Sequence, residues 1–116
     1  MRAPDGNLFD RPPPATGEVF EVLARLGGCE VERIVSSSHP EPGEYRQAHA
    51  EWVVLLKGGA RLQVAGELVS LKPGDHLLLP ADEPHRVLAT EEGTVWLAVH
   101  ARGAPAAKAQ PALPEV

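Results

Sequence analysis

Cysteine and aromatic residues are scarce in this sequence. Cys29 is the single cysteine in a chain of 116 residues, which excludes an internal disulfide and any zinc site built from several cysteines. The longest apolar run, residues 52–56, is far shorter than the roughly 20 residues that a membrane-spanning helix needs. The N-terminus also lacks the apolar stretch of a secretion signal. We therefore expect a cytoplasmic protein that does not enter a membrane.

The chain has no surplus of positive charge. Its formal net charge is -5 at pH 7, and no stripe of arginine or lysine runs along it, so the pattern typical of a nucleic-acid-binding protein is missing. Its length is that of one domain. We expect that one site, if any, dominates the function, and we expect no nucleic-acid partner.

Proline and alanine divide the chain into three segments. Prolines crowd residues 1–15, and residues 102–116 are mostly alanine and proline, so neither segment can bury much apolar surface. We expect the first to be an N-terminal arm, with residues 7–9 as its docking point, and the last to be a flexible tail. The folded domain should span residues 16–101.

The start of this domain has the spacing of one helix face. Its apolar residues are Val19, Phe20, Val22, Leu23 and Leu26. Thr16 is a suitable N-cap, and Gly27 with Gly28 provides a stop. The pattern predicts one short helix before the rest of the domain.

After Cys29 the sequence changes to short strands separated by turn signals. The turn signals are Pro42-Gly43, Gly58-Gly59, Ala65-Gly66, Pro73-Gly74-Asp75, Pro80 to Pro84 and Glu92-Gly93. Apolar and polar residues alternate over residues 60–64, as in a strand with one wet face. Residues 52–56 and 95–99 are apolar on both faces, so each needs cover on both sides. This pattern predicts a β-sandwich or barrel that forms a homodimer.

Two segments resemble the paired motifs of the cupin superfamily. The second motif, G-x5-P-x-G-x2-H-x3-N, is matched at Gly74, Pro80 and His85, while Asp82 replaces its second glycine and Ala89 its asparagine. Glycine, proline and histidine therefore follow one another at the family's spacing.

The first motif, G-x5-H-x-H-x3-4-E-x6-G, is matched in its second half. Glu51 and Gly58 stand at the E-x6-G positions, whereas Tyr45 and Gln47 stand where the family has two histidines. The resemblance covers roughly residues 43–101 and is strongest to small stand-alone cupins, most of which lack an assigned activity. It implies an all-β jelly-roll barrel, the double-stranded β-helix, whose mouth holds a metal or a small molecule.

Four residues are candidate ligands for a divalent metal such as Fe, Mn, Zn or Ni. His85 and Glu51 hold motif positions that the resemblance assigns to metal ligands. If His49 and Gln47 lie on one strand with Glu51, all three share a face, and His49 would complete a set of two histidines and one carboxylate. Gln47 is a weaker oxygen ligand. His100 either reaches the same cavity or ends the last strand at the surface.

Three classes of function remain open. The first, favoured by the loss of the motif histidines, is a cupin that binds a divalent metal, a small polar molecule or both, without turnover. The second is a metal-dependent dioxygenase or sugar-type isomerase, for which Tyr45 and His100 are the candidate additional acids or bases. The third is a metal-free scaffold for association.

Overall fold

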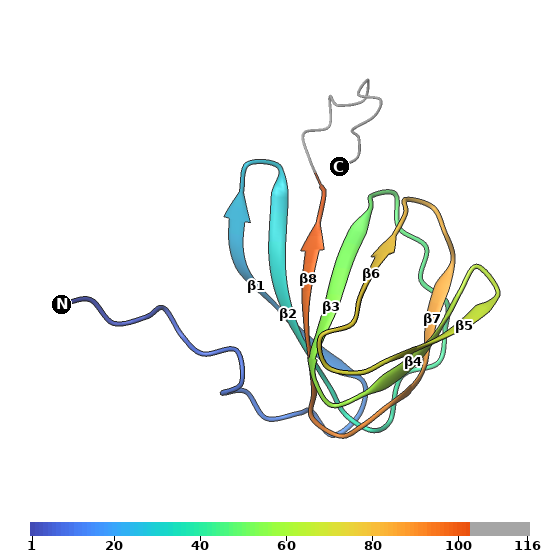
Figure 1. Cartoon of the computed structure of the whole chain (residues 1–116), viewed down its shortest axis with the longest axis horizontal. Coiled ribbons are helices and arrows are strands. Elements are labelled where there is room, and N and C mark those ends of the chain that lie inside the picture. The colour runs from blue at the N-terminus through green and yellow to red at the C-terminus, as the bar shows by residue number, and fades with distance from the viewer. Residues whose placement is uncertain (103–116) are drawn as a thin grey trace.

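A computed structural model describes residues 1–102 of the chain, and these residues form an all-β fold. Two antiparallel sheets face each other (Figure 1), one in the order β1-β2-β8-β3-β6 and the other in the order β5-β4-β7. The strands are β1 (Glu18–Leu26), β2 (Cys29–Ser36), β3 (Glu51–Lys57), β4 (Ala60–Val64), β5 (Glu67–Leu71), β6 (His76–Leu79), β7 (His85–Thr90) and β8 (Thr94–His100). The jelly-roll prediction is confirmed. Apart from Arg102, the predicted tail lies outside the described residues.

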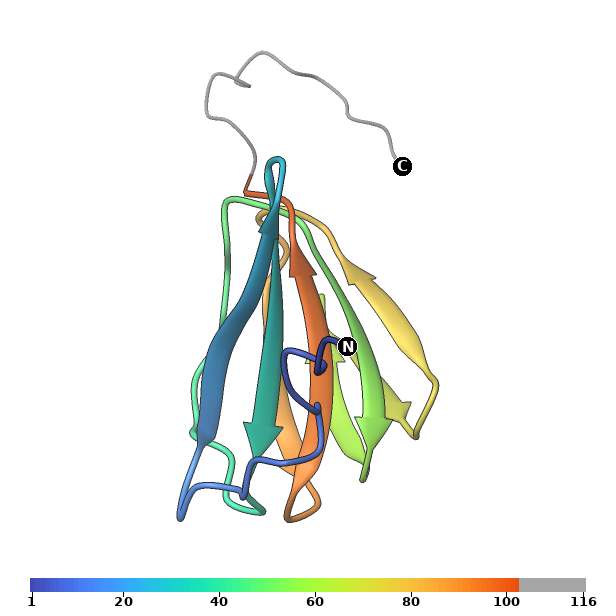
Figure 2. The ribbon, with the colours of Figure 1, turned by 90° about the vertical axis from the view of Figure 1, so that its left-hand side faces the viewer.

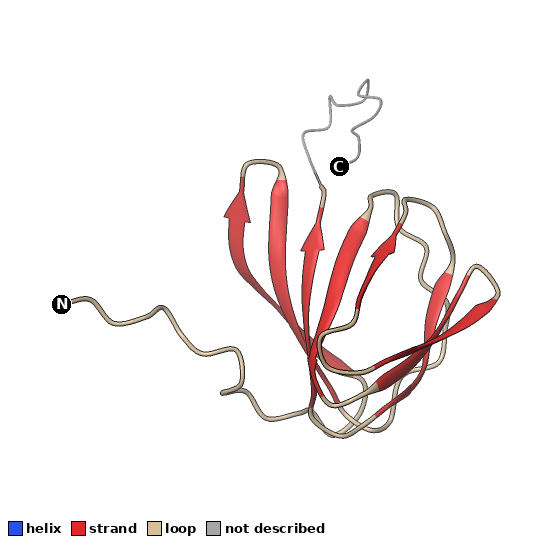
Figure 3. Ribbon diagram, viewed as in Figure 1, coloured by secondary structure: helices blue, strands red, loops and turns tan. Residues whose placement is uncertain are grey.

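The predicted helix before the sheets is wrong, because that segment is β1 (Figure 3). It pairs with β2 in antiparallel register, and the register shifts between Val22 and Ala24. Such a bulge adds one residue to one strand and breaks the period of two. The apolar residues on either side of Leu23 therefore imitate a helical stripe. Gly27, with a φ of 60°, forms the turn into β2 instead of ending a helix.

The predicted turn signals within the β region fall between strands. Gly58 shows why one of them needs glycine: its φ is 92°, and a Cβ there would lie 2.8 Å from the Cα of Thr94. A side chain at this position would therefore clash with the start of β8. The glycine that closes the first motif is thus fixed by a close backbone approach between β3 and β8.

The core lies between the two sheets and draws on both. Its buried apolar residues are Ile34, Val53, Leu55, Leu62, Leu71, Leu79, Trp96 and Ala98. Side chains alternate between the faces of a strand, so β3 presents Glu51, Val53 and Leu55 to this interior. The first of these is a carboxylate at the end of an otherwise apolar row.

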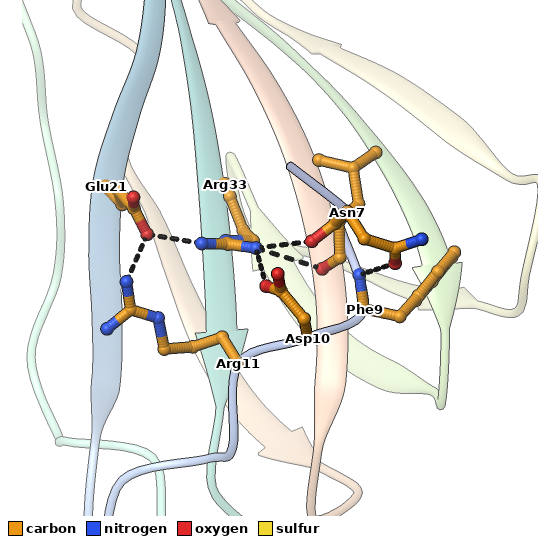
Figure 4. A network of polar contacts seen from close by, with 7 residues as sticks. Asn7, Phe9, Asp10, Arg11, Glu21 and Arg33 are labelled. Carbon is orange, nitrogen blue, oxygen red and sulfur yellow. Dashed lines mark hydrogen bonds and ion pairs between the residues drawn. The ribbon is translucent and has the colours of Figure 1, made fainter. Parts of the chain in front are cut away.

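The opposite, outer face of the large sheet is partly covered by the N-terminal arm (Figure 2). Arg33 of β2 is 6% exposed and holds the arm through its terminal nitrogens (Figure 4). Its Nη1 donates to the carbonyl of Asn7 at 2.9 Å and to Asp10 Oδ1 at 3.0 Å, and its Nη2 donates to Glu21. A buried arginine thus joins the arm to β1 and β2.

Candidate ligand-binding cavity

A cavity of about 230 Å³ lies between the two sheets, at the end of the barrel where β3 begins and β8 ends. Its apolar wall consists of Phe20, Ile34, Val53, Leu62, Leu79, Val87 and Trp96. Its polar lining consists of Glu18, Glu32, Tyr45, Gln47, Glu51, His85, His100 and Arg102. An apolar wall with a few polar groups converging on it is the usual composition of a small-molecule site.

Glu51 is the first residue of β3 and is 7% exposed. Its Oε1 accepts a hydrogen bond from Gln47 Nε2 at 2.7 Å. Its Oε2 lies 4.0 Å from His100 Nε2, beyond hydrogen-bond distance, and accepts no hydrogen bond from the part of the chain that is described. The oxygen is not fully enclosed, since Arg33 Nε is the one fully buried side-chain nitrogen or oxygen without a partner in residues 1–102. Because Glu51 lines the cavity, this oxygen is an acceptor for a donor that enters it.

His100, the last residue of β8, is buried and holds two partners. Its Nε2 lies 2.8 Å from Glu32 Oε1, and its Nδ1 lies 3.0 Å from His49 Nε2. The hydrogen bond to Glu32 raises the pKa of His100 above its ordinary value, although burial opposes the shift. Burial lowers the pKa of His49. The pair therefore favours a proton on His100 rather than on His49.

A second buried polar chain crosses the cavity wall. Trp96 Nε1 donates to Ser36 Oγ at 2.9 Å, and Ser36 Oγ donates to Glu18 Oε2 at 2.6 Å. Burial raises the pKa of Glu18, and the negative charges of Glu51 and Glu32 raise it further, against the effect of the Ser36 hydrogen bond. The carboxylates of the cavity therefore repel one another.

His85 begins β7 and is placed by the loop that precedes β3. The backbones of Tyr45 and His85 exchange two hydrogen bonds, of 2.7 Å and 2.9 Å, and their rings stack with centroids 5.6 Å apart. This short bridge holds both side chains against the cavity. It gives a structural reason for an aromatic residue at a position where the cupin motif has a histidine.

The structure brings three of the four predicted metal ligands to one cavity. Glu51, Gln47 and His85 line it, whereas His49 is not part of the lining and contacts His100 instead. The assumption of one continuous strand is wrong, since β3 begins at Glu51 and the preceding residues form a loop. Within residues 1–102, no group of three or more His, Cys, Asp or Glu is arranged to hold a metal ion. The metal site itself stays a prediction.

Sequence reasoning left the role of His100 open and did not consider Glu18 and Glu32. Glu18 was hidden by the helix prediction. Glu32 shares its face of β2 with Ile34, because alternate residues of a strand point the same way. The sequence could have indicated Glu32 only through its place on the same strand face as a core residue. That inference requires knowing that β2 lies inside the sheet and not at its edge. The structure places His100 in the cavity.

Comparisons with known proteins agree with this architecture. The family model of the cupin domain matches residues 34–100. No protein with a curated description matches the chain. Among the described residues there is no helix of the length and hydrophobicity that a membrane crossing requires.

Several solved structures are similar to the chain. A candidate mannose-6-phosphate isomerase from Ralstonia eutropha JMP134 is 38% identical, with a TM-score of 0.75 and coverage of 88% of this chain and 100% of the other. An RmlC-like cupin from Desulfovibrio desulfuricans is 17% identical, with a TM-score of 0.71 and coverage of 90% and 99%. A third, an RmlC-like cupin from Shewanella frigidimarina NCIMB 400, is 15% identical, with a TM-score of 0.68 and coverage of 80% and 84%.

The last two structures show likeness of fold alone, whereas the family model covers more than half of the chain. Sequence motifs, sheet topology and these matches agree, and the chain belongs to the cupin domain family.

Proposed function

We propose that this cupin binds a small polar molecule in its barrel cavity through Glu51 and the polar residues around it. The observation that carries the proposal is the free Oε2 of a carboxylate whose side chain is only 9% exposed. The side chain is largely removed from bulk water, yet this oxygen still has room for a hydrogen bond that a ligand in the cavity can donate.

The rest of the cavity supports the same proposal. Trp96 and the aliphatic residues offer apolar contact area, and His85 and Tyr45 add polar atoms at its edge. The volume of about 230 Å³ suits a ligand smaller than a typical drug-sized molecule. Binding without turnover is the simplest activity that this arrangement supports.

A divalent metal held by His85, Glu51, Gln47 and His49 stays a second, separate prediction. As placed, these side chains do not fit an ion together, because Gln47 occupies Glu51 Oε1 and His49 bonds to His100. Elemental analysis of protein purified without a histidine tag tests the prediction. Stoichiometric Fe, Mn, Zn or Ni that is lost in Glu51→Ala and His85→Ala supports it, and metal unaffected by both substitutions places the ion elsewhere.

A sugar-type isomerase is the second candidate function. The similarity to the candidate mannose-6-phosphate isomerase favours it, as does a histidine hydrogen-bonded to a carboxylate within the cavity, since such a pair suits general acid–base catalysis. Incubation with mannose 6-phosphate in deuterated water tests it. Ketose formation or deuterium incorporation that disappears in His100→Gln supports an isomerase, and unchanged sugar contradicts it.

Fluorescence of Trp96 can report binding, because this side chain lines the cavity while Trp52 lies on the outer face. In a Trp52→Phe background, the emission of Trp96 should change with at least one member of a panel of small polyols, sugars, amines and amino acids. Glu51→Gln should abolish the change, and Glu67→Gln, at the exposed first position of β5, should preserve it. A panel without effect, or an effect that Glu51→Gln leaves intact, contradicts the proposal.

We also propose that the protein is a homodimer. Trp52 is 37% exposed and Leu78 59% exposed, and they are paired neighbours on the outer face of β3 and β6, with Val99 of β8 beside them. A second copy would cover this apolar row. Sedimentation of the full chain should give a dimer that Trp52→Lys dissociates, and a 12.4 kDa species at micromolar concentration contradicts it.

A cytoplasmic location also stays a proposal, which cell fractionation tests.

A further inference from the structure

We propose that the ligand of the barrel cavity is a small organic cation, a primary amine with a short apolar body. The inference rests on the proposed function, since it names the chemical class that this cavity takes. It is carried by three glutamates on one cavity, by the free oxygen of Glu51 and by the scarcity of cations to balance them.

Glu18, Glu32 and Glu51 come from β1, β2 and β3 and line the same cavity. The side chains of Glu32 and Glu51 are only 13% and 9% exposed, so water screens their charges poorly. The sheet order places β8 between β2 and β3. Its His100 therefore stands between the carboxylates of Glu32 and Glu51, bonded to the first and 4.0 Å from the second.

The cations on this cavity do not offset three carboxylates. Arg102 is the one arginine or lysine that lines it within the described chain, and its Nε is bonded to Glu30 at 2.7 Å. A proton on His100 offsets one negative charge. The excess of negative charge favours a cationic ligand and opposes a phosphate or carboxylate.

The chemistry of an ammonium group fits the remaining acceptor. It has three N–H donors and no acceptor, so it can satisfy Glu51 Oε2 and still reach a second carboxylate. Behind these carboxylates the wall is apolar, with Ile34, Leu79 and Trp96. A neutral polyol would leave its hydroxyl groups against that wall, whereas a short alkyl chain packs against it.

Matched probes separate charge from shape. In the Trp52→Phe background at pH 7.5, titrations monitored by Trp96 fluorescence compare n-butylammonium, butan-1-ol, mannose, mannose 6-phosphate and Mn²⁺. Butylammonium should bind at least about tenfold more tightly than butan-1-ol, because a hydrogen bond to a charged group is worth that much or more. Mannose 6-phosphate should bind more weakly than mannose.

Glutamine substitutions then locate the charge that binds the amine. Glu51→Gln and Glu32→Gln should each weaken butylammonium binding about tenfold or more and leave butan-1-ol binding unchanged. The control Glu67→Gln removes one negative charge at the start of β5, where the side chain is exposed, and should change neither affinity. Urea unfolding of each variant confirms that it is folded.

Three results overturn the inference: equal affinity for the amine and the alcohol, amine binding that survives both substitutions, or occupation by Mn²⁺ with no binding of butylammonium. If mannose or its phosphate instead binds in a manner that requires Glu51, the ligand class is wrong and the proposed function stands. If no probe changes Trp96 emission, the amine proposal is wrong. The panel of polyols, sugars, amines and amino acids then tests the proposed function by itself.

Discussion

The two faces of the five-stranded sheet bury charge in different ways. On the outer face, the terminal nitrogens of Arg33 donate to two carbonyls and two carboxylates of the arm and of β1, although its Nε has no partner. On the inner face, Glu51 has one donor, from Gln47, and one oxygen that has none among the described residues. Both side chains are nearly inaccessible to solvent.

This difference separates a charge that holds the fold together from one that is available to a ligand. Removing a buried group whose hydrogen bonds are made breaks those bonds and leaves polar partners behind. Removing the charge of a group that lacks a donor relieves a cost, and functional sites commonly carry such a cost. The outer face should therefore respond to substitution in stability, and the inner face in binding.

The largest effect is expected on the outer face. Arg33→Ala removes the hydrogen bonds that join the arm to β1 and β2 and should lower the free energy of unfolding by about 2 kcal/mol. Urea denaturation measures the loss. Amide hydrogen exchange of residues 7–10 should become faster in the variant, because the arm loses its anchor.

Arg25→Ala is the matched control, because Arg25 also pairs with a glutamate but its side chain is 70% exposed. An exposed ion pair contributes little, so this variant should lose less than about 0.5 kcal/mol. Equal losses in the two variants would show that Arg33 contributes no more than a surface charge.

Part of the fold could be predicted from the sequence, and part could not. The jelly roll could be predicted because turn signals report on the backbone conformation of the turn itself, such as the positive φ of 92° at Gly58. The β1 strand was not, because a bulge at Val22 and Ala24 changes the period without a local signal.

The candidate site could be predicted from the sequence only in part. Glu51 and His85 were identified from motif positions, and both line the cavity. His49 was placed by strand parity, which fails because residues 37–50 include no long strand. The contact between Glu32 and His100 joins strands far apart in the sequence, and no spacing rule predicts which charged residues of two strands meet in a barrel.

A smaller effect is expected from His100 as pH changes. Its pKa is raised in the folded state, by Glu32 first, so protonation stabilises the fold below the ordinary pKa of about 6.5. This stability is lost as pH rises above that value through the raised pKa. Wild type should therefore lose urea resistance between pH 6.5 and 8 relative to His100→Gln.

The neighbouring histidine titrates outside this window. Burial lowers the pKa of His49, which contacts His100, so His49 acts mainly below pH 6.5. Parallel pH profiles of wild type and His100→Gln from pH 6.5 to 8 would show that the contact between His100 and Glu32 adds nothing to stability.

The most direct test of the account is the free energy of unfolding of Glu51→Gln without ligand. Glutamine keeps an acceptor for Gln47 and removes a buried negative charge that repels Glu18. We expect this variant to be as stable as wild type or more stable, because the carboxylate serves binding and not folding. A loss of about 1 kcal/mol or more would contradict it, since Glu51 would then be a structural charge like Arg33.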